Sequence, residues 1–390
     1  MHDVVVAGGG PAGLSAARAA AEAGASVLVV ERESAFGIPT RTSGGSFIAP
    51  LRRLGIAEHL WTPIRDVVFF GPTAEARFHY DDPPVCVLDV RALYQWLAER
   101  AAAAGAELAL RSTVVGVEER SDRVVLRVRG QGGERAIEAR WAVDATGTAA
   151  VLSRAVGMHP PFLRRGVGAE LDLAAPEFPV ETCVLAMGEW LAPSGYAWAF
   201  PYRPGRVRLG VGVMRPDTDI DPRALLQAAR DLPGLRGWLA GAQPIEVHAG
   251  VIPADPLRTT VVRGRIVCAG DSASQASTLV GEGIRFALGA GAAAGAAVGA
   301  AGRGGGPEAV RAYERDWSRR HRRDFAVAYR ISRVLARFDD AGWDRAVATL
   351  ARTPPWFAVR ALGSEFRAGT VMRLAATHPR LAVSFLRAAA

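Results

Sequence analysis

Three glycines near the N-terminus, Gly8, Gly10 and Gly13, have the spacing that lets a backbone approach a pyrophosphate. In this pattern one glycine permits a tight turn, one permits close contact with the phosphates, and one permits close packing of helix on strand. The Ala-rich segment that follows predicts a helix whose N-terminal N–H groups would face the phosphates. Glu31 ends the next apolar segment, where a carboxylate can accept hydrogen bonds from ribose hydroxyls rather than tolerate a 2′-phosphate. Together these residues predict a dinucleotide site.

A second pattern lies far downstream and favours FAD over NAD. An apolar strand expected over 266–269 runs into a Gly-Asp pair, and Asp271 could accept a hydrogen bond from a ribityl or ribose hydroxyl. Gly281 and Gly283 would let the N-terminus of the next helix approach a flavin ring. An unrelated helix cap is the alternative, because Asp is a common N-cap residue. The pairing of this motif with the N-terminal glycines favours FAD.

Two further segments suit the same plan. A strand ending at Asp144 and Gly147 would bring the chain past the nucleotide, and a helix is expected to begin near Asp89. Arg91 in the first turn of that helix is unfavourably placed for the helix dipole. The residues alone leave two interpretations open, an Arg that faces a phosphate or the flavin and a solvated surface Arg.

The elements that must position these residues alternate between strand and helix. The run over 4–7 is apolar without polar alternation, as expected for a central parallel strand. Tyr196, Trp198 and Phe200 recur at every second position, so in a strand they share one face, and the valines that follow over 207–213 alternate with Arg and Gly. On pattern alone this hairpin predicts an ordinary sheet core.

Composition excludes several classes of protein. The formal charge is +8, but every basic residue is Arg, which indicates coding bias more than nucleic-acid binding. The three cysteines have no metal or disulfide spacing and are expected to be buried and reduced. The Ala/Gly-rich stretch from Ile284 is expected to be a packed helix rather than a membrane span. Strand-like residues begin at Asp3, so no signal peptide is expected and a cytoplasmic protein is predicted.

The residues at this point resemble those of the geranylgeranyl reductase family, flavoproteins similar in fold to hydroxylases of the p-hydroxybenzoate type. The resemblance runs from the first strand through the Gly-Asp helix, and its most specific segment is PSGYAWAFP, which resembles the Y-x-W-x-F-P signature of the family. The other matching segments are GGGPAGLSAA, FGIPTRTSGGS, DVRALYQWL, GAELDL and GDSASQASTLVGEGIRFAL.

The resemblance implies an α/β fold with an α+β second domain: a Rossmann-like FAD-binding domain, an antiparallel-sheet substrate domain and C-terminal helices. The implied FAD-binding domain is discontinuous, over 1–64, 85–160 and 259–304, with the substrate domain over 65–84 and 161–258 and the helical region over 305–390. Together with the glycine motif, the implied cofactor-binding residues are Gly8, Gly10, Ala12, Gly13, Glu31, Thr42, Ser43, Gly45, Arg91, Val115, Asp271, Gly283 and Ile284. The implied substrate-binding residues are Tyr196, Trp198 and Phe200, with no metal.

Two positions depart from the family pattern. Thr42 stands where relatives often carry a Cys beside the flavin, and Thr278 stands where they usually carry Pro. Either change could alter the substrate or the reaction.

The function implied is reduction of C=C bonds in a prenyl lipid or terpenoid, with a hydride from reduced FAD and a proton added to the other carbon. Tyr196 is a proton-donor candidate only through its place in the signature. Electrons would come from NAD(P)H or a ferredoxin-like protein, because the sequence has no second nucleotide motif. The arginines Arg319, Arg320, Arg322 and Arg323 form either a solvated face or a contact with an anionic membrane surface or a substrate diphosphate.

Three alternatives carry their own discriminating features. A monooxygenase that hydroxylates or epoxidises a secondary metabolite keeps the fold, and Thr42 and Thr278 permit it. A flavin-dependent halogenase has a related W-x-W-x-I-P motif but relies on a catalytic Lys, and this chain has no Lys. A non-enzymatic flavin scaffold or prenyl-lipid carrier would hold FAD that stays inert to reductants in the presence of substrate.

Overall fold

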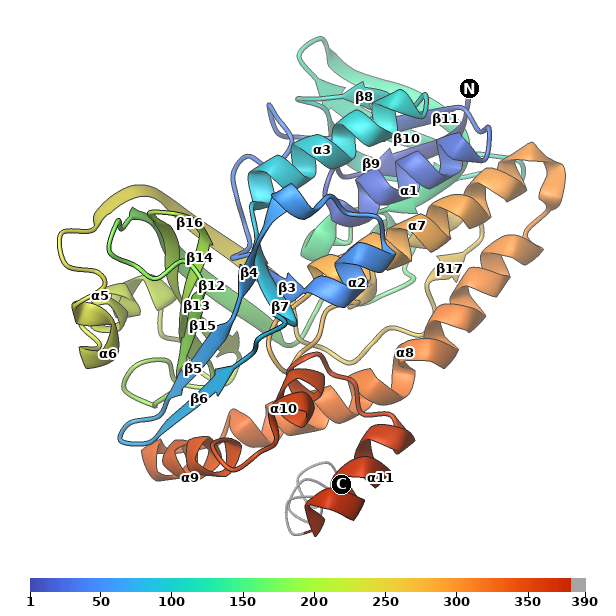
Figure 1. The fold of residues 1–390 in the computed structure, drawn as a ribbon. Coiled ribbons are helices and arrows are strands. Elements are labelled where there is room, and N and C mark those ends of the chain that lie inside the picture. The colour runs from blue at the N-terminus through green and yellow to red at the C-terminus, as the bar shows by residue number, and fades with distance from the viewer. Residues whose placement is uncertain (380–390) are drawn as a thin grey trace.

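The computed structural model describes residues 1–379 and contains two large sheets joined by a small one (Figure 1). The first sheet has the strand order β17-β18-β11-β1-β2-β8, and β9 and β10 extend it along β11. Its strands are β1 (His2–Ala7), β2 (Val27–Val30), β8 (Glu107–Ala109), β9 (Thr113–Glu119), β10 (Val124–Gly130), β11 (Gly133–Asp144), β17 (Val262–Arg263) and β18 (Ile266–Cys268). β18, β11, β1, β2 and β8 run parallel to one another, which confirms the Rossmann-like arrangement.

Helices α1 (Pro11–Glu22) and α7 (Ile284–Ala300) lie side by side in Figure 1 and pack with almost no space between their backbones. A Cβ built on Gly291 would lie 2.1 Å from the carbonyl oxygen of Ala12, and one on Gly295 would lie 2.1 Å from that of Ala16. By length and composition the segment Ile284–Gly305 could cross a membrane, but 61% of its most apolar window is buried inside the molecule. Its small residues therefore serve helix packing, as expected from the sequence.

The second sheet has the order β16-β12-β15-β14-β13-β5-β6 and is antiparallel except where β13 meets β5. Its strands are β5 (Asp66–Phe70), β6 (Glu75–His79), β12 (Arg165–Ala174), β13 (Thr182–Ala186), β14 (Tyr196–Arg203), β15 (Arg206–Arg215) and β16 (Gln243–Pro253). Val207, Leu209 and Val211 face the short helices α5 (Leu226–Arg230) and α6 (Pro233–Arg236) in a compact apolar cluster. The opposite face of β15 is left for the site.

A small antiparallel sheet and a set of helices connect these layers. The sheet consists of β3 (Gly45–Phe47), β7 (Val85–Leu88) and β4 (Trp61–Ile64). The remaining helices are α2 (Ile48–Arg53), α3 (Val90–Ala103), α4 (Val151–Ala155), α8 (Glu308–Leu335), α9 (Asp340–Leu350), α10 (Pro355–Leu362) and α11 (Ala368–Thr377). The long helix α8 runs back from the α7 side toward α9 and β6 (Figure 1). The fold class is therefore the one predicted, whereas the domain boundaries stay a prediction, and 380–390 lie outside the described residues.

The three cysteines, Cys86, Cys183 and Cys268, are all buried, as the sequence predicted, whereas their reduced state stays a prediction. Asp89 caps α3 by accepting a hydrogen bond from the Ala92 N–H at 3.1 Å, so that helix begins where the sequence predicted.

Candidate active site

A cavity of about 300 Å³ opens where β1, β2, β11 and β18 end, at the N-termini of α1 and α7. Its lining comes from several separate stretches of the chain. They include the turn Gly8–Ala12, residues between Val30 and Thr42, Val90 and Tyr94 of α3, the strand start Ser112–Val114, the turn Ala145–Ala149, Val251 and Ile252 of β16, the pair Gly270 and Asp271, and the pair Gly283 and Ile284. This is the crevice at the carboxyl ends of parallel strands where α/β folds bind nucleotides.

The three motif glycines do different work in this cavity. Gly8 has φ +105°, and a Cβ there would strike the Ala145 carbonyl, so the turn itself requires glycine. A Cβ on Gly13 would lie 1.9 Å from the Gly8 carbonyl oxygen, so this glycine serves helix–strand packing. Gly10 has φ −80°, and among residues 1–379 no atom lies within 4 Å of where its Cβ would be. Neither strain nor packing explains Gly10, so the open space beside it suits a ligand.

Glu31 is held at the edge of the cavity by two backbone donors. The Gly9 N–H donates to its Oε2 at 2.6 Å, and the Glu33 N–H donates to its Oε1 at 2.9 Å. Each carboxylate oxygen keeps a further lone pair for a hydroxyl. The geometry therefore suits a ribose diol, which is what the sequence predicted for this residue.

Asp271 faces the same cavity from the other side, in the turn that follows β18, and lies near Gly283 at the N-terminus of α7. Burial raises the pKa of its carboxyl to about 6, and among residues 1–379 no group donates a hydrogen bond to it. A buried carboxylate without a donor is costly unless a ligand supplies one. The hydroxyls of a bound nucleotide would meet that need, so Glu31, Gly10 and Asp271 together fit FAD.

Asp144, by contrast, is a structural residue. It is fully buried, and its carboxylate accepts hydrogen bonds from the Thr146 hydroxyl at 2.6 Å and from the Ser153 N–H at 2.8 Å. These bonds shape the turn that passes the nucleotide cavity. The chain does pass the cavity there, as the sequence predicted.

A second cavity, of about 100 Å³, adjoins the first and shares Arg41, Thr42, Ile252 and Gly281 with it. Its floor is the face of the second sheet opposite to Val207, Leu209 and Val211. Strand register places Gly250, Gly168, Gly212 and Tyr196 opposite one another in a row across β16, β12, β15 and β14. Removing side chains from three strands in register leaves a shallow channel of bare backbone.

The indole of Trp198 lies over this glycine backbone. A Cβ on Gly210 would lie 2.3 Å from the ring, and Cβ atoms on Gly212 and Gly168 would lie 3.2 and 3.3 Å from it. Trp198 and Tyr196 line the second cavity, and their rings meet edge to face with centroids 5.7 Å apart. Phe200, the third aromatic residue of the signature, is buried against Gly45 and lines neither cavity.

The hydroxyl of Tyr196 is already engaged. It donates to the Val280 carbonyl oxygen at 2.5 Å, in the glycine-rich turn before α7. Burial also raises the pKa of this phenol. These contacts make Tyr196 a poor acid and a link between the aromatic strand and the cofactor loop.

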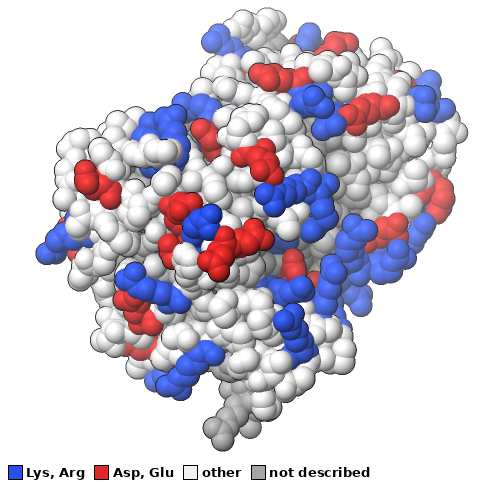
Figure 2. All heavy atoms as spheres, viewed as in Figure 1, with Lys and Arg blue, Asp and Glu red and all other residues white. Residues whose placement is uncertain are grey.

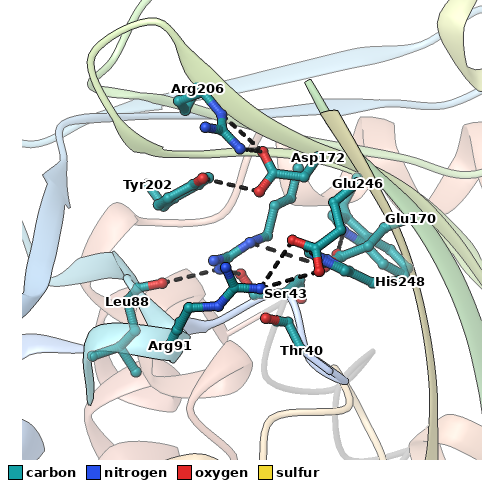
Figure 3. Close-up of polar contacts among 12 residues, drawn as sticks. Thr40, Ser43, Leu88, Arg91, Glu170, Asp172, Tyr202, Arg206, Glu246 and His248 are labelled. Carbon is teal, nitrogen blue, oxygen red and sulfur yellow. Dashed lines mark hydrogen bonds and ion pairs between the residues drawn. The ribbon is translucent and has the colours of Figure 1, made fainter. Parts of the chain in front are cut away.

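An ionic network forms one wall of the second cavity, and Figure 3 shows its members pointing toward one another. His248 Nδ1 lies 2.9 Å from Glu170 Oε1, and His248 Nε2 lies 3.3 Å from Glu246 Oε2. The Trp198 indole N–H donates to Glu170 Oε2 at 3.2 Å. Burial alone would lower the pKa of His248, but the hydrogen bonds and negative charges of Glu170 and Glu246 outweigh it and raise the pKa.

Arg91 belongs to this network rather than to the lining of the nucleotide cavity. Its guanidinium lies 3.1 Å from each carboxylate oxygen of Glu246, and the neighbouring Val90 and Tyr94 line the nucleotide cavity instead. The predicted flavin contact of Arg91 has no support in this geometry and stays a prediction.

Arg208, on the face of β15 opposite to Val207 and Leu209, links the loop at Ser43 to the second sheet. It is 2% exposed, donates to the Ser43 and Leu88 carbonyl oxygens at 2.9 and 3.0 Å, and stacks on the Tyr202 ring. It also lies 4.0 Å from Glu170. Its position holds Ser43, and with it Thr42, beside both cavities.

The predicted cofactor residues thus divide into three groups by the cavity that they line. Those that line the nucleotide cavity are Gly8, Gly10, Ala12, Glu31, Thr42, Asp271, Gly283 and Ile284. Ser43 lines the second cavity, and the residues that line neither are Gly13, Gly45, Arg91 and Val115. Thr278, the second departure from the family pattern, is buried, and its hydroxyl has no hydrogen-bond partner among residues 1–379.

The closest approach to a metal-ligand set among residues 1–379 is formed by Asp172, Glu246 and His248. Both carboxylates are ion-paired with arginines, Asp172 with Arg206 at 2.8 Å and Glu246 with Arg91 at 3.1 Å (Figure 3). The cluster is therefore an ion-pair network and not a metal centre by its geometry.

Sequence reasoning missed Glu170, His248, Glu246 and Arg208. The one available signal was periodicity, because Arg208 shares a strand face with the two glycines that it precedes. The partners on β12 and β16 have no such signal, since a lone His or Glu in a strand is ordinary.

Comparison with known proteins agrees with this site. Residues 3–159 match a family described as FAD dependent oxidoreductase. Digeranylgeranylglycerophospholipid reductase 2 of Methanothermobacter thermautotrophicus is 32% identical over 296 residues, which cover 73% of this chain and 74% of that protein. Its namesake from Methanopyrus kandleri is 28% identical over 346 residues, 86% of each chain.

Among solved structures, a geranylgeranyl bacteriochlorophyll reductase-like protein from Thermoplasma acidophilum superposes with a TM-score of 0.84. It is 21% identical and is covered, like this chain, over 99% of its length, which shows a shared fold. Fold and site define a flavin-dependent oxidoreductase. More closely, the chain belongs to the geranylgeranyl reductase family, and that prediction from the sequence is confirmed.

Proposed function

We propose that this chain is an FAD-dependent reductase that saturates carbon–carbon double bonds of a prenyl lipid or terpenoid. The observation that carries the proposal is the second cavity, whose glycine floor and Trp198 indole form a flat channel beside the nucleotide cavity. A thin hydrocarbon chain needs such a channel because it fills space without requiring hydrogen bonds. The names of the relatives support a prenyl substrate.

When bound and reduced, FAD supplies a hydride to one alkene carbon. The chain itself does the positioning. Glu31 and Asp271 would accept hydrogen bonds from hydroxyls of the cofactor, and the N–H groups at the starts of α1 and α7 would be available to its phosphates and ring. Trp198 and Tyr196 orient the alkene against the cavity shared at Thr42 and exclude water from it.

Anaerobic mixing of the reduced enzyme with geranylgeranyl compounds tests this proposal. Flavin absorbance should recover, and mass spectrometry should show a product that has gained two hydrogens per reduced bond. Failure of every prenyl compound to reoxidise the flavin would contradict the proposal. Oxygen-dependent NAD(P)H consumption that tracks substrate would instead indicate the hydroxylase or epoxidase.

We further propose that electrons reach the flavin from NAD(P)H or from a ferredoxin-like protein. Support comes from the single dinucleotide motif in the sequence, which leaves a transient or external donor. Stopped-flow reduction with NADH, NADPH and a reduced ferredoxin in parallel would identify the donor. Reduction by none of them at a rate that supports turnover would contradict this part.

We also propose that the protein works in the cytoplasm in peripheral contact with an anionic membrane, through α8. Arg319, Arg320, Arg322 and Arg323 are all exposed, and basic side chains gather in Figure 2 where α8 runs. Each basic residue near an anionic surface contributes about 1 kcal/mol at most and is screened by salt.

Cosedimentation with vesicles tests this contact. Arg322→Glu with Arg323→Glu should weaken binding to phosphatidylserine vesicles, while Arg77→Glu on β6 serves as the matched exposed control. Equal binding of all three proteins would show that α8 is only a solvated face.

A further inference from the structure

The wall of the second cavity carries ionisable groups that a hydrocarbon does not need. Strand register places His248, Glu170, Gly210 and Trp198 in one row across β16, β12, β15 and β14. Glu170 and His248 line the cavity and are each 3% exposed. Buried ionisable groups cost free energy and bind no alkene, so recognition of a prenyl chain leaves them unexplained.

The ionisable groups Glu170, His248 and Glu246 form a chain with Glu170 at the cavity and Glu246 partly exposed to solvent. His248 joins the two ends, with Nδ1 2.9 Å from Glu170 and Nε2 3.3 Å from Glu246 (Figure 3). The Glu246 side chain is 36% exposed, and its partner Arg91 is 41% exposed. His248 Nε2 makes no hydrogen bond among residues 1–379, so a proton taken from water at Glu246 would cross the 3.3 Å ion-pair contact to His248 and then reach Glu170 at the cavity wall.

We infer that the His248–Glu170 pair delivers the proton consumed in alkene reduction and regains it from solvent through Glu246. This inference rests on the proposed function. The hydride supplied by the reduced flavin forms one C–H bond, and the π electrons of the alkene form the second with the proton from the pair. The alkene gains two electrons and the flavin loses two, while the pair is left one proton short until water replaces it.

Two observations favour this pair over Tyr196. The Tyr196 hydroxyl is bound to the Val280 carbonyl, whereas the His248 ring sits between two carboxylates. The charged groups around His248 are Glu170 and Asp172 on β12, Glu246 on β16, Arg208 on β15 and Arg91 on α3.

Their balance fixes the pH dependence. Burial lowers the pKa of His248, but the hydrogen bonds and charges of the two glutamates outweigh it, so the pKa is raised above its ordinary value. The rate of flavin reoxidation by substrate should therefore be high below the raised pKa and should fall as the pH rises through it.

The test compares reoxidation rates of pre-reduced, FAD-loaded His248→Gln, Glu246→Gln and Glu181→Gln across pH 5 to 10. Glu181 is an exposed partner of Arg65 in the same sheet region and serves as the matched control. His248→Gln should slow reoxidation by about 10²-fold and flatten the pH profile, since a positioned acid contributes roughly 10²–10⁴-fold. Glu246→Gln, which is partly exposed and should fold normally, should move the descending limb to lower pH.

A second readout does not depend on turnover. Imidazole NMR titration of the protein without FAD should show His248 titrating above an ordinary histidine, and below its wild-type position in Glu246→Gln. Wild-type rates and pH profiles in both variants, while the wild type is reoxidised by a prenyl substrate, would overturn the relay alone. If no prenyl compound reoxidises the wild type, the proposed function fails and the relay fails with it.

Discussion

The two adjoining cavities are built from different parts of the chain. The nucleotide cavity uses backbone: bare glycine at Gly8 and Gly10, helix N-termini, and the two carboxylates Glu31 and Asp271 that wait for hydroxyls. The second cavity uses glycine as floor but ionisable side chains as wall, with Glu170 and His248 paired across two strands. The nucleotide cavity suits a polar ligand and is built from groups set in short local segments of the chain. The second cavity suits an apolar ligand but has charged groups beside it.

This difference shows where each half of the chemistry is specified. Groups that bind a cofactor can be set within one strand–turn–helix unit, because the ligand is long and follows the backbone. Groups that act on a substrate must converge on one point, and here four strands spread over residues 165–253 supply them.

The sharpest test of the nucleotide side contrasts two neighbouring glycines. Gly13→Ala forces a methyl group against the Gly8 carbonyl and should destabilise the apoprotein by about 1–3 kcal/mol. The added methyl group of Gly10→Ala meets only open space, so the free energy of unfolding of this variant should change by less than about 0.5 kcal/mol. Its FAD affinity should nevertheless fall at least about tenfold, roughly 1.4 kcal/mol. Thermal unfolding of the apoproteins measures stability, and FAD fluorescence titration measures affinity. Unchanged FAD affinity in Gly10→Ala would show that FAD does not occupy the space beside Gly10.

Asp271→Asn separates the cofactor carboxylate from the relay. FAD should bind about tenfold to a hundredfold more weakly at pH 8, because a hydrogen bond to a charged acceptor contributes about 1.5–3 kcal/mol. In the wild type, affinity should decline as the pH falls through about 6, where the carboxylate gains its proton. The variant should show no such decline, whereas the exposed Asp81→Asn should behave as the wild type does.

The same group makes a prediction for stability without cofactor. Its pKa in the folded state, about 6, lies above the ordinary 3.8, so its stabilising contribution is complete below pH 3.8 and is lost as the pH rises through about 6. Apo Asp271→Asn should therefore unfold at a higher temperature than apo wild type at pH 8, with the gap closing toward pH 4. A constant gap would indicate that Asp271 does not titrate in this range.

Gly210→Ala disturbs only the second cavity. Its methyl group would lie 2.3 Å from the Trp198 ring, so the indole must leave the glycine floor. We expect KM for the prenyl substrate to rise about tenfold, roughly 1.4 kcal/mol, with FAD affinity unchanged. Gly237→Ala, on the same domain with open space at its Cβ, is the matched control. A loss of FAD in Gly210→Ala would mean that the two cavities are not separable.

Tyr196→Phe should have the smallest effect. It removes one hydrogen bond to the Val280 carbonyl, which contributes about 0.5–1.5 kcal/mol to stability. Reoxidation of the flavin by substrate should stay within a few fold of the wild type at every pH. A hundredfold slower reoxidation, together with loss of the descending limb of the pH profile, would identify Tyr196 as the proton donor in place of His248.

The same comparison explains how far the sequence could be interpreted. Gly8, Gly10, Glu31 and Asp271 were predicted to serve the cofactor, and all four line the nucleotide cavity, because their signal lies in short local spacings. Tyr196 and Trp198 were likewise found through a local signature. Phe200 follows the same alternation as Tyr196 and Trp198, yet its ring packs against Gly45 and not into a cavity. The position of a residue along a strand does not reveal which other part of the chain will cover it.

The ionic network had no local signal. Glu170, Glu246 and His248 meet only because β12 pairs with β16 in one register, and a shift of one residue would turn each side chain to the other face. Arg91 is a second example. The helix that carries it was predicted from the sequence, but its contact with Glu246 on β16 was not.

The close contact between α1 and α7 limits which amino-acid changes this protein can accept during evolution. Any replacement of glycine adds at least one carbon, and at Gly291 and Gly295 that carbon would lie 2.1 Å from a carbonyl oxygen of the facing helix. Any other amino acid at these positions must push α1 and α7 apart. The N-termini of both helices, which border the nucleotide cavity, would then move apart as well. Natural variants of this chain should therefore keep glycine at positions 291 and 295.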